Sequence, residues 1–265
     1  MTDNMLQAIT PVILTYNEGH NIARTLSALG WAKEIVVVDS GSTDDTLAIL
    51  KADPRIRLYT RKFDSHHGQW RFATQETNIT TPWILRLDAD YYVPSALVEE
   101  MSKLDANGPE NAYRISFDYA IFSKKLLASL YPPNTILLRR GAFAVADAGH
   151  TESWSVTGPV SALRSRVVHD DWKPMSPWVL AQANYMAREL KIEKHRGLRD
   201  WLRHHPPLMP VAVFFYCLFF KGLIFDGRKG IFYTLQRTIA ESVYALFYLE
   251  TLLTKEASPP DGRKR

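Results

Sequence analysis

The sequence has little cysteine and little net charge, and each shortage excludes a class of protein. Its 265 residues include one cysteine, Cys217, so an internal disulfide is excluded and a reducing compartment is indicated. The formal net charge is +4, which is too small to indicate a nucleic-acid partner. Hydrophobic residues make up 46% of the chain and charged residues 23%, so the composition is that of a globular protein.

Sequence signals of several other protein classes are absent as well. No G-x-G-x-x-G motif follows the first apolar run, which disfavours a dinucleotide-binding dehydrogenase, and there is no Walker P-loop. Residues 1–10 are polar and acidic, and they lack the positively charged start and the long apolar run of a signal peptide. We therefore expect a cytoplasmic protein that is not exported.

What is present between residues 9 and 88 is an alternation of short apolar runs with helical patterns. The patterns predict strands at residues 9–14, 34–39, 56–59 and 83–88, and helices at residues 21–29, 44–51 and 69–78. Strands that alternate with helices form right-handed βαβ units. The expected fold class is therefore α/β, with a mostly parallel sheet flanked by helices.

Polar residues follow three of these predicted strands, at residues 15–18, 39–42 and 88–90. Ligands of such sheets bind at the carboxyl ends of the strands. Asp88 and Asp90 can converge there on one hard cation, Mg²⁺ or Mn²⁺, which would neutralise a pyrophosphate leaving group. A plain turn is the alternative for an isolated D-x-D, but its place beside two other polar strand ends favours the metal site.

Asp39 ends the most β-branched of the predicted strands. A carboxylate at this point can accept a hydrogen bond from the N–H of a nucleotide base, and Gly41 lets the backbone approach a ligand closely. The alternative is an ordinary capped connection between a strand and a helix. Together with the metal motif, the position favours nucleotide binding.

Residues 12–18, 35–46 and 83–90 resemble, in order and spacing, the motifs of family-2 glycosyltransferases of the GT-A fold. The resemblance implies a UDP-sugar donor and inversion at the anomeric carbon. More narrowly, the chain is similar to the bacterial branch that includes lipopolysaccharide-core β-glucosyltransferases. Within that branch an acidic residue often follows the D-x-D motif, whereas this chain has Tyr91.

The resemblance also implies roles for individual residues. The donor nucleotide is expected to contact Thr15, Tyr16, Asn17, Glu18, Asp39, Gly41, Ser42, Arg71 and Asp88, of which Arg71 would reach the pyrophosphate. Asp90 is implied as the direct metal ligand, with Asp88 beside the metal or the ribose. His169 stands where related enzymes often place a histidine, and it would complete the metal site or contact the diphosphate.

An inverting transfer needs a base that takes the proton of the attacking acceptor hydroxyl. We expect Glu152 to be that base and Asp147 to be the second candidate, because the related branch has a His-Glu element at a comparable place. Here that element is His150 with Thr151 and Glu152. A solvated loop carboxylate is the alternative for Glu152.

The C-terminal part differs in composition from the rest. Residues 208–220 are almost wholly apolar but shorter than the roughly 20 residues that cross a bilayer, and residues 231–253 form a long helical pattern. Basic residues precede them, between Arg188 and Arg203. We expect a catalytic domain at residues 1–190 and a helical appendage at residues 191–265 that lies on anionic lipid. A buried helical cap or an oligomer interface is the alternative.

The sequence thus predicts a metal-dependent inverting glycosyltransferase at the inner face of the cytoplasmic membrane. It would move a hexose from a UDP-sugar to a saccharide acceptor, lipid-linked, of lipopolysaccharide core or another cell-surface polysaccharide. One alternative is transfer to a polyprenyl phosphate, which is already ionised and needs no base. Another is a catalytically silent sugar-nucleotide-binding scaffold, against which the intact Asp88-Ala89-Asp90 argues.

Overall fold

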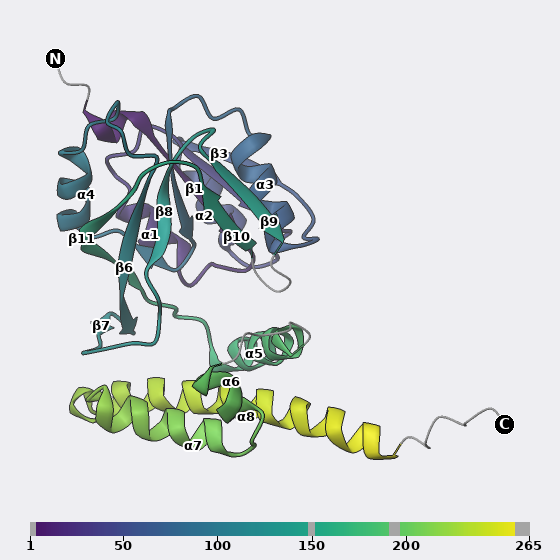
Figure 1. Ribbon diagram of the computed structural model, residues 1–265. Coiled ribbons are helices and arrows are strands. Elements are labelled where there is room, and N and C mark those ends of the chain that lie inside the picture. The colour runs from purple at the N-terminus through teal and green to yellow at the C-terminus, as the bar shows by residue number, and fades with distance from the viewer. Residues whose placement is uncertain (1–3, 148–151, 191–196, 258–265) are drawn as a thin grey trace. The chain divides into compact units, whose positions relative to one another are not determined.

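The computed structural model describes residues 4–147, 152–190 and 197–257, which form two compact units. The sheet unit comprises Met1–Lys125 and Leu130–Lys173, and the helical unit comprises Leu126–Ser129 and Pro174–Arg265 (Figure 1). The division falls at Lys173 and not at the expected residue 190. The reason is that α5 (Met175–Glu189) packs along the C-terminal helix α8 (Arg228–Ala257).

Within the described residues, the sheet unit contains a nine-stranded mixed sheet in the order β3-β2-β1-β4-β8-β6-β11-β5, with β7 paired to β6. Its strands are β1 (Ile9–Thr15), β2 (Ile35–Asp39), β3 (Ile56–Thr60), β4 (Trp83–Asp88), β5 (Tyr91–Tyr92), β6 (Ala112–Ile121), β7 (Lys124–Lys125), β8 (Asn134–Arg139) and β11 (Val160–His169). The first four pair in parallel, as the alternating pattern predicted, whereas β8 runs antiparallel to both β4 and β6.

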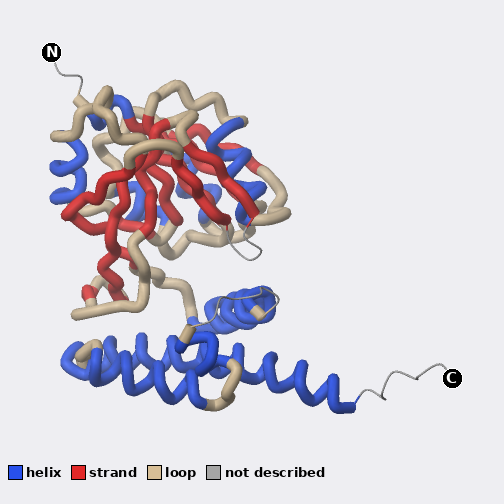
Figure 2. The backbone as a smooth tube through the Cα atoms, in the orientation of Figure 1, coloured by secondary structure: helices blue, strands red, loops and turns tan. Residues whose placement is uncertain are grey.

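Helices cover both faces of this sheet (Figure 2). They are α1 (Ile22–Ser27), α2 (Thr46–Ala52), α3 (His66–Gln75) and α4 (Ser95–Ser102), and the 3-10 turn η1 (Met5–Ala8) precedes β1. Successive residues of a strand point to opposite faces. Accordingly, Ile13 and Val37 join the core under α1, α2 and α4, while Val12 and Val36 join the core under α3. The α/β fold class is confirmed.

A short hairpin adds to the layer that contains α3. Its strands are β9 (Phe143–Asp147) and β10 (Glu152–Val156), which pair antiparallel with Glu152 opposite Asp147. Trp154 on β10 contacts Trp70 on α3 edge to face, with ring centroids 5.7 Å apart. The hairpin therefore fixes Glu152 against the sheet.

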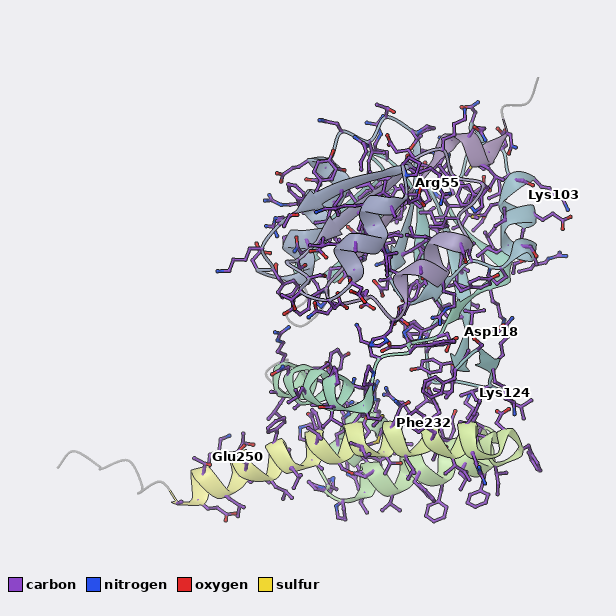
Figure 3. All side chains as sticks on the ribbon, turned by 180° about the vertical axis from the view of Figure 1, so that it is seen from behind. Arg55, Lys103, Asp118, Lys124, Phe232 and Glu250 are labelled. Carbon is purple, nitrogen blue, oxygen red and sulfur yellow. The ribbon has the colours of Figure 1, made fainter. Side chains whose placement is uncertain are left out.

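The helical unit contains α5, α6 (Leu198–Arg203), α7 (Leu208–Phe215), the π-helical turn η2 (Tyr216–Phe220), η3 (Leu223–Asp226) and the long α8, whose side chains are drawn in Figure 3. The buried Arg203 donates two hydrogen bonds of 2.8 Å to Glu241 on α8 and one of 3.0 Å to Glu189 on α5. These ion pairs hold three helices of the unit together. None of the helices in the described residues is long and apolar enough to cross a membrane.

Candidate active site

The carboxyl ends of β1 and β2 lie side by side, with Thr15 in register with Asp39. The buried Asp39 carboxylate accepts hydrogen bonds from Thr15 Oγ1 at 2.9 Å, from Gly41 N at 2.9 Å, and from Ser42 N and Oγ at 2.8 and 2.5 Å. A carboxylate has about four acceptor positions, so Thr15 and the loop together occupy them. Asp39 therefore shapes the backbone of residues 40–42, and Gly41 adopts a φ of +95° there.

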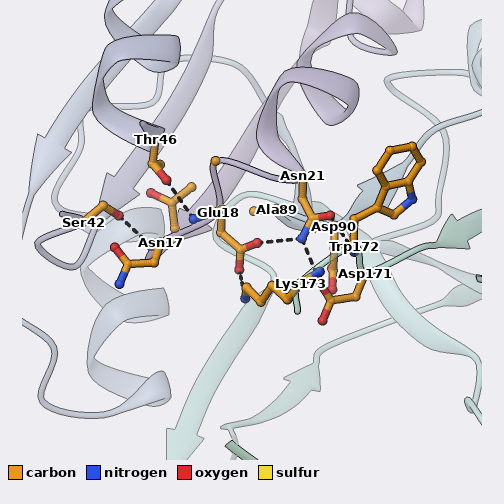
Figure 4. A network of polar contacts seen from close by, with 12 residues as sticks. Asn17, Glu18, Asn21, Ser42, Thr46, Ala89, Asp90, Asp171, Trp172 and Lys173 are labelled. Atoms are coloured by element: carbon orange, nitrogen blue, oxygen red, sulfur yellow. Dashed lines mark hydrogen bonds and ion pairs between the residues drawn. The ribbon is translucent and has the colours of Figure 1, made fainter. Parts of the chain in front are cut away.

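Residues 16–18 are tied to the same loop. Asn17 N donates to Ser42 Oγ at 2.8 Å, and Asn17 Oδ1 accepts from Thr43 N at 2.8 Å. Glu18 N donates to Thr46 Oγ1 at 2.7 Å (Figure 4). Tyr16 stands 57% exposed beside them. The structure thus brings the predicted nucleotide-binding residues of the first two strand ends into one platform with an open aromatic ring.

Asp88, Ala89 and Asp90 form the turn after β4. Thr25 Oγ1 donates to Ala89 O at 2.6 Å, and Asp170 N donates to Asp90 O at 3.1 Å, so the turn is held from two sides. Asp90 Oδ2 lies 3.2 Å from His169 Nε2 at the end of β11. The structure therefore brings together the three residues that were expected to bind metal, since Asp88 lies in the same turn.

The electrostatics of this group keep Asp90 anionic. Burial acts to raise the pKa of Asp90, but His169 and Lys173 outweigh it and hold that pKa below its usual value. Burial likewise acts to lower the pKa of His169, and the Asp90 and Asp88 carboxylates outweigh it and raise that pKa. The pKa of Asp88 is raised by loss of surrounding water and by Asp90. Asp90 is therefore the carboxylate of this turn that most readily stays ionised.

Two buried atoms of this pair, Asp90 Oδ1 and His169 Nδ1, have no hydrogen-bond partner within the described part of the chain. Across all the described residues, there is no group of three or more His, Cys, Asp or Glu side chains that could hold a metal ion by itself. Mg²⁺ is usually bound by one or two carboxylates together with substrate phosphates. The residues present fit a divalent cation of that kind.

A cavity of about 340 Å³ opens beside Asp88. It is lined by His66, Trp70, Arg86, Asp88, Tyr91, Tyr131, Asn134, Thr135, Glu152 and Trp154. Aromatic walls with a few convergent polar groups are typical of small-molecule sites. Both Asp88 and the predicted base Glu152 reach this cavity.

Glu152 is held in the cavity by two donors that bind the same oxygen. Arg86 Nη1 lies 3.0 Å and Trp154 Nε1 lies 3.1 Å from Glu152 Oε1. The Arg86 guanidinium also lies over the Trp154 ring, 4.5 Å from its centroid, and over the ring of Trp70. Arg86 and both tryptophans were not recognised in the sequence, although a lone charge inside the apolar strand 83–88 is a signal that points to Arg86.

The Glu18 side chain points away from the Asp39 loop and into a second polar network (Figure 4). Its carboxylate binds Lys173 and accepts from Asn21 Nδ2 at 3.0 Å, and Asn21 also donates to Asp171 at 2.9 Å. Burial and the nearby Asp90 outweigh Lys173 and raise the pKa of Glu18 to about 7. Lys173 was not recognised in the sequence, because its partner lies far away along the chain.

Arg71 and Asp147 are not joined to these groups. Arg71 lies on the exposed side of α3, where its nearest acidic partner is Glu76 at 4.0 Å, so its expected contact with a pyrophosphate stays a prediction. The Asp147 backbone pairs with Glu152, but its side chain lies outside the described part of the structure. His150 and Thr151 lie outside the described residues altogether.

Comparison with known proteins gives a consistent family match. Residues 10–154 match the family model described as glycosyl transferase family 2. An uncharacterised glycosyltransferase of Rickettsia conorii is 30% identical over 114 residues, which are 43% of this chain and 39% of the relative. The lipopolysaccharide core biosynthesis glycosyltransferase LpsC of Rhizobium meliloti is 32% identical over 106 residues, or 38% of each chain. The chain thus spans about two fifths of the length of these curated relatives.

Solved structures that are similar share little sequence with the chain. Residues 1–349 of TarS from S. aureus are 12% identical, with a TM-score of 0.49 and coverage of 96% of this chain and 93% of that one. Glucosyl-3-phosphoglycerate synthase from Mycobacterium tuberculosis, in complex with Mn²⁺, UDP and phosphoglyceric acid, is 13% identical with a TM-score of 0.42. It covers 71% of this chain and 80% of its own.

Proposed function

The chain belongs to glycosyl transferase family 2, and on that premise we propose that it transfers a hexose from a UDP-sugar to a saccharide hydroxyl, with inversion at the anomeric carbon. The observation that carries this proposal is the pair formed by Asp90 and His169, 3.2 Å apart, beside Asp88 at the carboxyl ends of β4 and β11. Such a pair suits a donor whose leaving group is a diphosphate.

Asp90, His169 and Asp88 would hold a divalent cation, Mg²⁺ or Mn²⁺, which when bound neutralises the charge that develops on the leaving diphosphate. The lowered pKa of Asp90 keeps its carboxylate ionised for this purpose. The hydrogen bonds of Thr25 and Asp170 to the turn hold Asp90 in place. The orphaned Asp90 Oδ1 is the atom left for such a ligand.

The platform at the ends of β1 and β2 would bind the uridine. Tyr16 offers an exposed ring on which a base can stack, and Asn17 and Ser42 fix the loop that borders it. Asp39 would act through the loop that it shapes, because its acceptor positions are already used. The nucleotide would then lie between this platform and Asp88.

Glu152 would act as the base. As the acceptor oxygen attacks the anomeric carbon, the bond from that carbon to the diphosphate oxygen breaks, and the hydroxyl proton passes to the Glu152 carboxylate. Arg86 and Trp154 both bind Oε1 and so fix the orientation of the carboxylate. Trp70, Trp154 and Tyr131 provide aromatic walls against which sugar rings can pack. Asp147 stays the second candidate.

The acceptor would be a lipid-linked saccharide of a cell-surface polysaccharide such as lipopolysaccharide core, reached at the inner face of the cytoplasmic membrane. The similarity to LpsC supports this assignment. The exposed apolar side chains of the helical unit support a location at an anionic membrane surface.

Thermal stabilisation and hydrolysis of a panel of UDP-hexoses, each with and without Mn²⁺, tests the proposal. We expect one UDP-hexose to stabilise the protein only with Mn²⁺ and to be hydrolysed slowly. Asp90→Asn should lose at least about 100-fold in turnover, since it removes the charge that holds the cation. Asp105→Asn, an exposed aspartate after α4, is the matched control. Unchanged turnover in Asp90→Asn would remove the metal assignment.

A further inference from the structure

The helical unit exposes a continuous apolar ridge. Leu208, Val211, Phe215 and Phe219 recur at spacings of three and four residues along one side of α7 and η2, and each is 42–56% exposed. The rings of Phe215 and Phe219 stack, with centroids 5.9 Å apart. On the opposite side, Met209, Val213 and Cys217 are buried. Only one side of this apolar helix is therefore covered within the described part of the chain.

The ridge continues into the turns that follow. Phe220 is 79% exposed and Phe225 is 83% exposed, which are the two largest values among the large hydrophobic side chains of the described residues. Figure 3 shows aromatic rings projecting from α7 along one edge of the pair of helices. Contiguous apolar surface of this kind marks a site that meets lipid or protein.

Basic residues lie at the end of the ridge where the chain turns from α7 to α8. Lys221 extends over the Tyr216 ring, with Nζ 5.5 Å from the centroid, and Arg228 is exposed at the start of α8. The acidic residue of this turn, Asp226, is buried and accepts a hydrogen bond from Leu127 N at 2.8 Å. The exposed charge of the turn is therefore positive, beside the most exposed phenylalanines.

We propose that this ridge inserts into the boundary between headgroups and acyl chains of a membrane that contains anionic lipid, with α7 lying in the plane of the surface. Aromatic rings beside lysine and arginine suit that boundary, since the rings enter the apolar layer while the cations meet phosphate. Residues 208–220 are fewer than the roughly 20 that a membrane-spanning helix needs, a length that suits a segment in the plane of the surface. The inference rests on the proposed membrane location and names the surface responsible for it.

Co-sedimentation of the full chain with vesicles tests the ridge. The protein should bind vesicles of phosphatidylcholine mixed with phosphatidylglycerol, and less strongly those of phosphatidylcholine alone. Phe220→Glu combined with Phe225→Glu should lower the partition coefficient at least about tenfold. Arg228→Gln should lower it about fivefold on the anionic vesicles only. Leu180→Glu on α5, another exposed apolar position at 65%, is the control and should bind like the wild type.

Hydrolysis of the UDP-hexose in solution and circular dichroism separate the surface from folding and catalysis. A folded double variant that still hydrolyses the donor but no longer binds vesicles supports the proposed membrane role of the ridge. If the wild type hydrolyses the donor but binds neither kind of vesicle, the proposed membrane role of the ridge is wrong. The proposed transferase function is not affected by that result. Light scattering gives a second way to reject the proposal. If the wild type is a dimer that binds no vesicles, and the double variant is a monomer, the ridge is an interface between two copies of the chain.

Discussion

At the scale of single residues, the proposed role of Glu152 as the base can be tested most directly. Glu152→Gln keeps an oxygen that can accept from both Arg86 and Trp154, so the cavity should keep its shape. It removes the proton acceptor, and we expect kcat for a saccharide acceptor to fall about 10²- to 10³-fold while the KM for the donor stays unchanged. Steady-state kinetics with the best donor measures both.

The control for this variant is Glu99→Gln, an exposed glutamate on α4 that should leave kcat at the wild-type value. A Glu152→Gln enzyme with normal turnover would place the base elsewhere. If that enzyme were active only toward a polyprenyl phosphate, it would favour the alternative acceptor, because an ionised phosphate needs no base.

The raised pKa of Glu18 predicts that the stability of the protein depends on pH. Its pKa rises from 4.5 to about 7 on folding, so ionising it costs more in the folded state than in the unfolded state. The stability that the neutral carboxyl contributes is present below pH 4.5 and is lost as the pH rises to about 7, by up to about 3 kcal/mol. In Glu18→Gln this part of the decline should be absent when urea unfolding is measured at a series of pH values.

Glu250→Gln, which alters an exposed carboxylate on α8, should keep the wild-type slope of stability against pH. Equal slopes in wild type and Glu18→Gln would mean that Lys173 holds Glu18 ionised throughout this pH range.

At the scale of elements, the loop after β2 depends on one backbone conformation. Gly41 has a φ of +95°, which side-chain-bearing residues rarely adopt, although a Cβ there would meet nothing within 4 Å. Gly41→Ala should therefore cost about 1–2 kcal/mol in unfolding free energy through backbone strain alone. Because the same loop carries the hydrogen bonds to Asp39, UDP binding should weaken as well.

Gly30→Ala is the matched control, since a Cβ at Gly30 also meets nothing within 4 Å and no positive φ strains it. Urea unfolding and titration with UDP and Mn²⁺ measure the two effects. Equal stability and equal UDP affinity in the two variants would show that the loop tolerates a side chain and does not shape the nucleotide site.

The elements also show why part of the site could be predicted from the sequence. Asp39 and Asp88 end strands that follow each other locally as βαβ units, and parallel pairing brings such ends to one edge of a sheet. By contrast, Arg86 meets Glu152 through a separate hairpin, and Glu18 meets Lys173 across most of the sheet unit. Contacts of that kind depend on tertiary packing, which no local pattern in the sequence encodes.

At the scale of the whole molecule, the two units divide at Lys173, whereas the expected boundary was residue 190, for a related reason. The helix α5 precedes residue 190 along the chain, but its packing partner lies in the C-terminal part. Met186 on α5 packs with Ala240 and Tyr244 on α8, so the helix belongs to the C-terminal core. Each unit has its own core: one cluster lies on each face of the sheet, and another lies in the helical unit.

Separate cores predict two unfolding transitions in calorimetry. UDP with Mn²⁺ should raise the midpoint of one transition only, because the proposed donor site lies wholly in the sheet unit. Arg203→Ala should lower the unfolding free energy of the other transition by about 3–5 kcal/mol, since it removes the buried guanidinium that binds both Glu241 and Glu189. Lys255→Ala, an exposed change near the end of α8, is the control. A single transition that responds equally to the ligand and to Arg203→Ala would mean that the two cores unfold as one cooperative structure.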